Sequence, residues 1–323
     1  MADSSVERDG LHGVAPDRDA HITPGRRRRR AADSMVPEPE FQSYYGRPIL
    51  HQPTWKALDI AGYFFFGGLA GASSTLAVAA SATGHPALAR PLRYGAAGAI
   101  TVSAAALVHD LGRPGRFYNM LRVLKPSSPM SVGSWILAAY GPAAIGAALP
   151  LPAPLGAPLS VAAAALGPAV ATYTAVLVSD TAVPAWHEGY CEMPFLFAGS
   201  AAAAASGLGL VTTPVSGAGP ARRLGVIGAT AELAVGRVMR RRMGMVGEVY
   251  EQGRAGRLVK AAEALSLAGI GLAVAGRRSR AASAAAGVCW LAGSALTRFG
   301  VFEAGVQSAA DPKYVVEPQR AGK

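Results

Sequence analysis

Long apolar stretches alternate with short polar connections along most of this chain. No charged residue lies between Ile60 and Ser81, or between Pro126 and Ser179. A helix needs about 20 apolar residues to cross the hydrocarbon core of a bilayer. The pattern therefore predicts an all-α membrane protein with eight transmembrane helices, at about residues 60–81, 92–109, 131–149, 158–179, 194–212, 222–238, 260–276 and 281–299.

Small and aromatic residues mark the first of these helices. Gly67, Gly68 and Gly71 fall within the segment FFFGGLAGAS, and small residues let a neighbouring helix or a ligand approach the backbone closely. Helix packing and ligand contact explain this segment equally well. Tyr44 and Trp55 precede the helix, and aromatic residues of this kind suit the membrane–water interface.

The composition agrees with a membrane location. The chain of 323 residues is 51% hydrophobic and 16% charged, whereas a soluble domain carries about 25% charged residues. A net charge of +11 could indicate nucleic-acid binding. However, most basic residues lie beside the apolar stretches, where membrane orientation and anionic lipids account for them. We therefore expect contact with a lipid membrane and no nucleic-acid partner.

The two ends of the chain are polar. Residues 1–43 include five consecutive arginines and no periodic apolar pattern, which predicts a disordered basic tail. Residues 306–323 form a polar C-terminal tail. With eight helices, both termini share one side with the connections that follow the second, fourth and sixth helices. Most lysines and arginines lie on that side, so the positive-inside rule predicts a multi-pass plasma-membrane protein with both termini in the cytoplasm.

The polar side chains with chemical potential gather on this same side. The opposite connections are short and contain no acidic residue. This asymmetry predicts one working face, where protons or a partner are handled. Its candidate proton-relay residues outside the helices are His109, Asp110, Asp180, His187 and Glu188.

The connection between the second and third helices, from His109 to Trp135, is the most polar of these segments. Histidine titrates near neutral pH and a carboxylate can orient it, so His109 and Asp110 could handle protons as a pair. A salt bridge between Asp110 and Arg113 at the helix end explains the same residues equally well. We interpret the basic residues of this segment as contacts to a protein partner or to phospholipids: Arg113, Arg116, Arg122 and Lys125.

Two polar residues lie inside predicted helices. Glu232 falls in the sixth, and a carboxylate within a membrane is a functional candidate by default. A charge pair with Arg237 or another arginine at a helix end is the competing interpretation. Tyr173 falls in the fourth helix, where its hydroxyl could bond a quinone carbonyl or simply belong to a packed aromatic side chain.

Several kinds of site are not expected in this chain. A b-type heme needs axial ligands inside the helix bundle, and no pair of histidines falls at that depth. Cys191 and Cys289 are too few for an iron–sulfur cluster, which takes about four thiolates. The chain also lacks a P-loop and any spacing typical of metal ligands. We therefore expect no heme, no iron–sulfur cluster and no metal.

Three segments resemble the NrfD family, the polysulfide reductase membrane subunits. They are FFFGGLAGAS, HDLGRPGRFYNMLRVLKPSSPMSVGSW and YTAVLVSDTAVPAWHE, and the resemblance covers about residues 44–305. It implies eight helices in two four-helix bundles, at about 57–179 and 194–300, without heme. It also implies a site for menaquinone or another quinone near the face that docks a ferredoxin-like iron–sulfur subunit. That subunit in turn joins a molybdopterin catalytic subunit.

The resemblance also suggests roles for individual residues. Tyr173 matches the family's quinone-site tyrosine, and His51 matches the histidine near the first helix; Trp55, Gly67 and Gly68 complete the expected quinone-binding set. The chain would then pass electrons between the ferredoxin-like partner and the quinone pool. Two other interpretations stay open: an ion- or proton-translocating subunit without a quinone site, or a pure membrane anchor.

Overall fold

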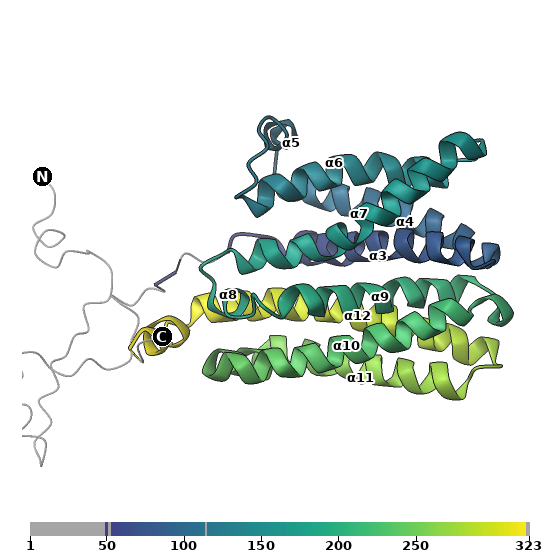
Figure 1. Cartoon of the computed structure of the whole chain (residues 1–323). Coiled ribbons are helices and arrows are strands. Elements are labelled where there is room, and N and C mark those ends of the chain that lie inside the picture. Colours follow the sequence, from purple (N-terminus) through teal and green to yellow (C-terminus); the bar gives the residue numbers. More distant parts are fainter. Residues whose placement is uncertain (1–48, 51–52, 114, 321–323) are drawn as a thin grey trace, which may run out of the picture. The chain divides into compact units, whose positions relative to one another are not determined.

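The computed structural model describes residues 49–50, 53–113 and 115–320, and their regular structure is entirely helical (Figure 1). The chain divides into two compact units, residues 54–307 and a second unit made of residues 1–53 and 308–323. Within the second unit, the described residues include the short helix α13 (Lys313–Arg320). The predicted disordered tail and His51 lie outside the described residues.

Four long helices in the first half of the larger unit contact one another in a ring, here called the first helix set. α3 contacts α4 and α7, and α6 contacts the same two helices. The short helix α5 (Arg116–Met120) lies in the connection before α6. The four helices are α3 (Ala57–Ala82), α4 (Pro86–Asp110), α6 (Pro129–Ala148) and α7 (Ala153–Ser179).

The second helix set follows in the chain and contacts the first through α9. α9 packs on α10 and α10 on α11, while hydrogen bonds from Thr297 and Trp290 join α12 to α10 and α11. Short turns connect these helices: α8 (Pro184–His187), η2 (Val215–Gly217) and η3 (Gly244–Tyr250). The set consists of α9 (Met193–Thr212), α10 (Gly219–Met243), α11 (Gly253–Ala275) and α12 (Arg280–Ala310).

Glycine lets the helices approach closely in both sets. A Cβ atom on Gly71 of α3 would overlap the backbone of Gly167 on α7, and the reverse also holds. Gly199 of α9 and Gly228 of α10 make an equivalent close contact in the second set. Association inside a bilayer gains little from the hydrophobic effect, so packing of this kind is what holds such helices together.

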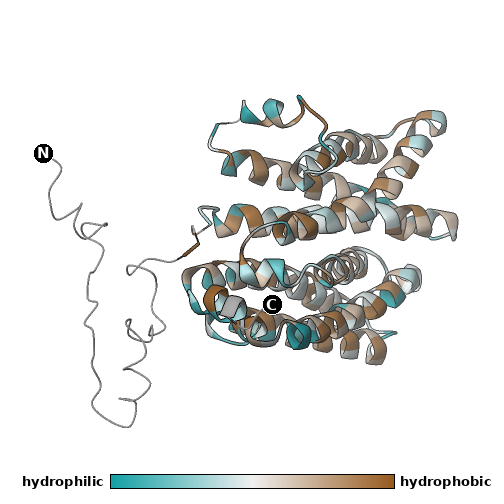
Figure 2. Cartoon of the chain, turned by 60° about the vertical axis from the view of Figure 1, so that its left-hand side comes forward, coloured by the Kyte–Doolittle hydropathy of each residue, from teal (hydrophilic) through white to brown (hydrophobic). Residues whose placement is uncertain are grey.

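Six helices of the described residues are long and apolar enough to cross a membrane: α3, α4, α7, α9, α11 and α12. Figure 2 shows polar residues concentrated at helix ends and connections. α6 carries no charge but is rich in glycine, serine and proline, and α10 carries Glu232 and several arginines. A long helix covers every stretch predicted as helical, but eight membrane crossings stay a prediction.

The observed helices extend beyond several predicted ends. α4 begins at Pro86 rather than 92, α11 at Gly253 rather than 260, and α12 ends at Ala310 rather than 299. The basic segment 237–260, predicted to be a connection, is mostly helical. Charged residues had marked the predicted ends, but a helix that emerges from the apolar layer continues unbroken through charged residues.

Candidate functional site

Residues on one face of α3 make close contacts with α4 in the first helix set. Asp59, Tyr63 and Gly67 are spaced by four residues and so share a helix face. Asp59 Oδ2 lies 2.8 Å from Nδ1 of His109 on α4. Ser103, also on α4, donates a hydrogen bond of 3.1 Å to the carbonyl oxygen of Tyr63. A Cβ atom on Gly67 would lie 3.3 Å from that same serine hydroxyl, so α4 runs closely along this face of α3.

His109 finds its carboxylate on another helix rather than on its sequence neighbour. The His109 side chain is 67% exposed and that of Asp59 only 13%, so the carboxylate is sheltered and the imidazole faces outward. Asp110 instead accepts a hydrogen bond of 3.3 Å from the backbone N–H of Lys56. The chemistry expected of a His109–Asp110 pair is therefore offered by Asp59 and His109.

Tyr173 is a buried phenol whose hydroxyl has no hydrogen-bond partner in the structure. Its ring meets that of Tyr63 edge-on, with centroids 6.3 Å apart. The ring also lies against Gly133 of α6, where any Cβ atom would be 2.5 Å from it. An unsatisfied buried polar group costs about 1–3 kcal/mol, so this hydroxyl is a free hydrogen-bonding group held in place by packing.

The two tyrosines and the His–Asp pair lie near the same end of the first helix set. Tyr63 follows the first residue of α3, Ala57, by six positions, and Tyr173 precedes the last residue of α7, Ser179, by six. At a rise of 1.5 Å per residue both lie about 9 Å from the helix ends. Asp59 is one turn closer to the surface than Tyr63. The exposed His109, with Asp59, therefore lies about one helical turn closer to the surface than the buried pair of Tyr63 and Tyr173.

Other residues of the expected quinone-binding set have different neighbours. Gly68 faces α12, because its Cβ atom would lie 3.1 Å from a nitrogen of Arg298. Trp55 stacks on the buried Trp186, with ring centroids 5.8 Å apart. The structure thus places Gly67 beside the contact of Tyr63 with Ser103, whereas Gly68 and Trp55 pack against other elements.

The connection after α7 is fixed to the end of α10. Arg242 contacts both carboxylate oxygens of Glu192, at 2.5 and 2.7 Å, and also donates to the carbonyl oxygen of Glu188. Asp180 and His187 are exposed, and Nδ1 of His187 lies 3.1 Å from the carbonyl oxygen of Ser179. These relay candidates form a region separate from the Asp59–His109 pair. We call the side that carries both regions the polar face.

The segment around α5 presents a mixed surface on the polar face. The four predicted docking residues are all exposed: Arg113, Arg116, Arg122 and Lys125. Large apolar side chains are exposed among them, including Tyr118, Val123 and Leu124. A surface of this composition suits a protein partner or the membrane interface.

Glu232 belongs to a buried polar cluster in the second helix set. Thr297 of α12 donates a hydrogen bond of 2.6 Å to its Oε1, while Oε2 has no partner. The positive charge nearby is Arg298, which is fully buried and is one of the helix-end arginines considered as partners beside Arg237. Arg298 donates to the carbonyl oxygen of Phe197 at 2.8 Å and lies 3.6 Å from the centre of its ring.

The sequence-based interpretation missed Asp59, and it covered Arg298 only as one of several helix-end arginines. Arg298 stood at the end of a helix predicted to finish at 299, and a charge at a helix end needs no explanation. Because α12 continues to Ala310, that arginine lies about 18 Å from the helix end at 1.5 Å per residue. An arginine within an otherwise apolar helix was the available signal.

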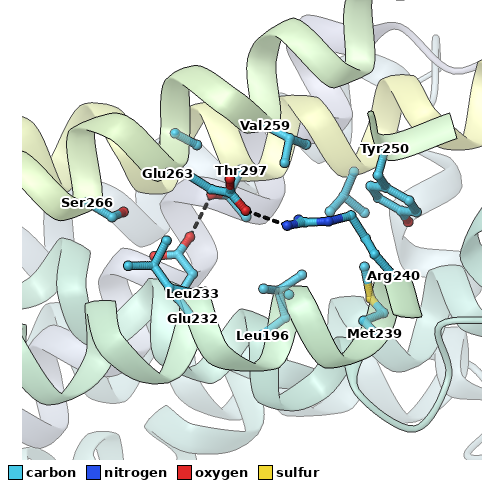
Figure 3. Close-up of a pocket in the computed structure, with 13 residues that line it drawn as sticks. Leu196, Glu232, Leu233, Met239, Arg240, Tyr250, Val259, Glu263, Ser266 and Thr297 are labelled. Carbon is cyan, nitrogen blue, oxygen red and sulfur yellow. Dashed lines mark hydrogen bonds and ion pairs between the residues drawn. The ribbon is translucent and has the colours of Figure 1, made fainter. Parts of the chain in front are cut away.

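A small cavity adjoins Glu232 between α10, α11 and α12 (Figure 3). Its volume is about 30 Å³, enough for about one or two water molecules and far too small for a quinone ring. At the other end of the cavity, Arg240 bonds Glu263 at 2.6 Å. The second helix set therefore contains a water-sized space with a few polar groups in its lining, whereas the first encloses an unpartnered phenol.

Residues 50–246 match the family model described as Polysulphide reductase, NrfD. The matched segment spans more than half of the chain and includes α3 to α10, with Asp59, His109, Tyr173 and Glu232. α11 and α12, which carry Glu263 and Arg298, lie beyond it. No curated protein matched the chain.

Proposed function

The chain belongs to the polysulphide reductase NrfD family, and we propose that it is the quinone-interacting membrane subunit of an iron–sulfur/molybdopterin oxidoreductase. Members of this family are membrane subunits of polysulfide reductase-like complexes. In the proposed complex, a ferredoxin-like iron–sulfur subunit docks on the polar face. Electrons pass between that subunit and menaquinone or another quinone in the first helix set. The eight long helices then cross the membrane as two four-helix bundles.

The observation that carries this proposal is the unpartnered hydroxyl of Tyr173. Buried polar groups in native proteins almost always have a partner, so an orphan of this kind calls for an explanation. A quinone carbonyl is the acceptor that a phenol O–H lacks here. Gly133 leaves room for the tyrosine ring and Tyr63 meets its edge, so the donor is already oriented.

The neighbouring residues suit the proton chemistry of such a site. Reduction of a quinone to a quinol consumes protons as well as electrons, and the redox chemistry resides in the quinone and in the partner's clusters. His109 is exposed and can exchange protons with water, while Asp59 lies 2.8 Å from its Nδ1 and orients the ring. Tyr63 lies one turn below Asp59 on α3, so protons enter on the side where the phenols lie.

The exposed basic segment around α5 supports docking on the same face. Arg113, Arg116, Arg122 and Lys125 carry charge that an acidic protein surface would complement. The exposed Tyr118 supplies the aromatic contact that is typical of interface centres. Docking there would bring the partner's clusters to the end of the helix set that holds Tyr63 and Tyr173.

Substitution of Tyr173 by phenylalanine tests the proposal in the intact complex. The change removes only an unpartnered hydroxyl, so it should leave assembly intact and stability unchanged or higher. We expect quinone reduction to fall at least about 10-fold, the scale of a lost orienting or proton-transfer group.

The matched control is Tyr140→Phe, which removes a buried hydroxyl of the same helix set that already has Ser74 as its partner at 2.8 Å. This control should retain quinone activity. Full activity in Tyr173→Phe would overturn the assignment of that residue. An anchor or a transporter without a quinone site predicts no bound quinone in any variant.

A further inference from the structure

Charged side chains in one region of the second helix set become progressively less exposed. Glu251 is 64% exposed, Glu263 27% and Arg240 14% at the side chain, and Glu232 is 5% exposed. Arg240 lies between the two outer carboxylates, 3.9 Å from Glu251 and 2.6 Å from Glu263. Charge is costly inside an apolar layer and is retained there mainly for function. These charged side chains are therefore candidates for a functional role.

The cavity joins the inner and outer members of this series (Figure 3). Glu232 and Arg240 are eight residues apart on α10, which is about 12 Å at 1.5 Å per residue. Ser266 and Thr297 add hydroxyl groups to its lining, and the carboxylate of Glu263 lines it as well. Buried water usually makes two to four hydrogen bonds to otherwise unsatisfied polar groups, and Oε2 of Glu232 is such a group.

We propose that this cavity is a hydrated proton inlet, which connects the Arg240–Glu263 pair with Oε2 of Glu232. A proton passes from water at the polar face along the water in the cavity and binds the carboxylate oxygen. The hydroxyl of Thr297 keeps its hydrogen bond to Oε1 throughout. Release follows the same route in reverse, so each proton taken up from the face is returned to it.

The inlet ends at Glu232 because the next group inward carries a fixed positive charge. Arg298 is fully buried, and its side chain fills the space between Phe197 and Gly68. A guanidinium offers only donors and stays protonated, so it repels a second positive charge. The side chains that face Glu232 from the surrounding helices are Ser200, Ser266, Thr297 and Arg298, with Arg240 and Glu263 in the lining of the cavity.

Infrared difference spectroscopy on the full-length chain in its complex tests protonation at this site. Lowering the pH should produce a carboxylic-acid C=O band that is lost in Glu232→Gln, while Glu263→Gln retains it. Transfer to D₂O should shift the band by deuteron exchange. A purely structural Glu232, bonded only to hold α10 and α12 together, gives no pH-dependent band, and that result overturns the proposal.

A blocked cavity tests the route. At Gly236, a Cβ atom would lie 3.5 Å from Leu196 and 3.6 Å from Arg240, so a larger side chain fits only by filling the cavity. Gly236→Leu should slow deuteron exchange at Glu232 by at least 10-fold. The control is Gly271→Leu on α11, where a Cβ atom meets nothing within 4 Å. In this variant, deuteron exchange at Glu232 should be as fast as in the parent protein. Equal exchange in the two variants would rule out the cavity as the route.

These readouts do not involve quinone. The inlet goes beyond the proposed quinone function, so either can fail alone. Tyr173→Phe should leave the Glu232 band and its exchange rate unchanged, and Glu232→Gln should leave bound quinone in place.

Discussion

The two helix sets are packed by the same kind of residue but bury different polar groups. Both bring helices together at paired glycines, Gly71 with Gly167 in the first set and Gly199 with Gly228 in the second. The first set then encloses a neutral phenol, Tyr173, with a free hydroxyl. The second encloses the carboxyl group of Glu232 and a water-sized cavity. Similar scaffolds thus present one site suited to a flat neutral ligand and one suited to protons.

The largest loss of stability should come from disrupting the close glycine contacts that occur in both helix sets. Gly167→Val places two methyl groups against the backbone of α3, and Gly199→Val does the same to α10. Each should destabilise the protein by about 3 kcal/mol, at the upper end of overpacking costs. Thermal unfolding of the purified complex measures this. Gly98→Val on α4, where a Cβ atom meets nothing within 4 Å, should be near neutral.

Removal of one polar group from each set should give unequal effects on stability. Arg298→Met removes the buried guanidinium near Glu232 and its hydrogen bond to the Phe197 carbonyl, and should cost about 3 kcal/mol, the scale seen when one member of a buried charged cluster is removed. The double variant Glu232→Met/Arg298→Met should recover most of that loss. Tyr173→Phe removes an unpartnered group and should cost nothing. A double variant as unstable as the sum of the single ones would show that the two charges are energetically independent.

Substitution of a proton-handling residue should lower quinone reduction in the first helix set but not in the second. Asp59→Asn weakens the hold on His109 but keeps the imidazole, so it should lower quinone reduction about 3- to 10-fold, less than the roughly 100-fold or more that an acid–base group itself contributes. Glu263→Gln, in the second set, should leave quinone reduction unchanged. Steady-state rates at saturating quinone check both. Loss of quinone reduction in Glu263→Gln would show that the second helix set takes part in the quinone reaction, which contradicts two separate sites.

The smallest effect is expected at the surface of the polar face. Arg242→Gln removes the paired contacts with Glu192 and should cost about 0.5–1 kcal/mol, because exposed ion pairs contribute little. The loss should shrink further at high salt. If Arg242→Gln destabilised the protein more than Arg298→Met, the connection after α7 would contribute more to the stability of the second helix set than the buried cluster does.

The sequence allowed the helices to be predicted, but not the partners of their charged residues. Hydrophobic stretches located every long helix, and the resemblance singled out Tyr173. Asp59 and Arg298 were not singled out, because each stood at a predicted helix end where charge is ordinary. His109 was matched with its neighbour Asp110, although its carboxylate comes from α3. Pairings of this kind depend on how helices pack, which a single sequence does not reveal.

Photoaffinity labelling of the intact complex with an azidoquinone tests the central claim most directly. Peptide mapping should place the label on α3 and α7, around Tyr63 and Tyr173, and excess unlabelled quinone should prevent it. The segments that line the cavity at Glu232 should stay unlabelled. Label confined to α10, α11 or α12, or no competition by quinone at α3 and α7, would contradict the assignment of the quinone site to the first helix set.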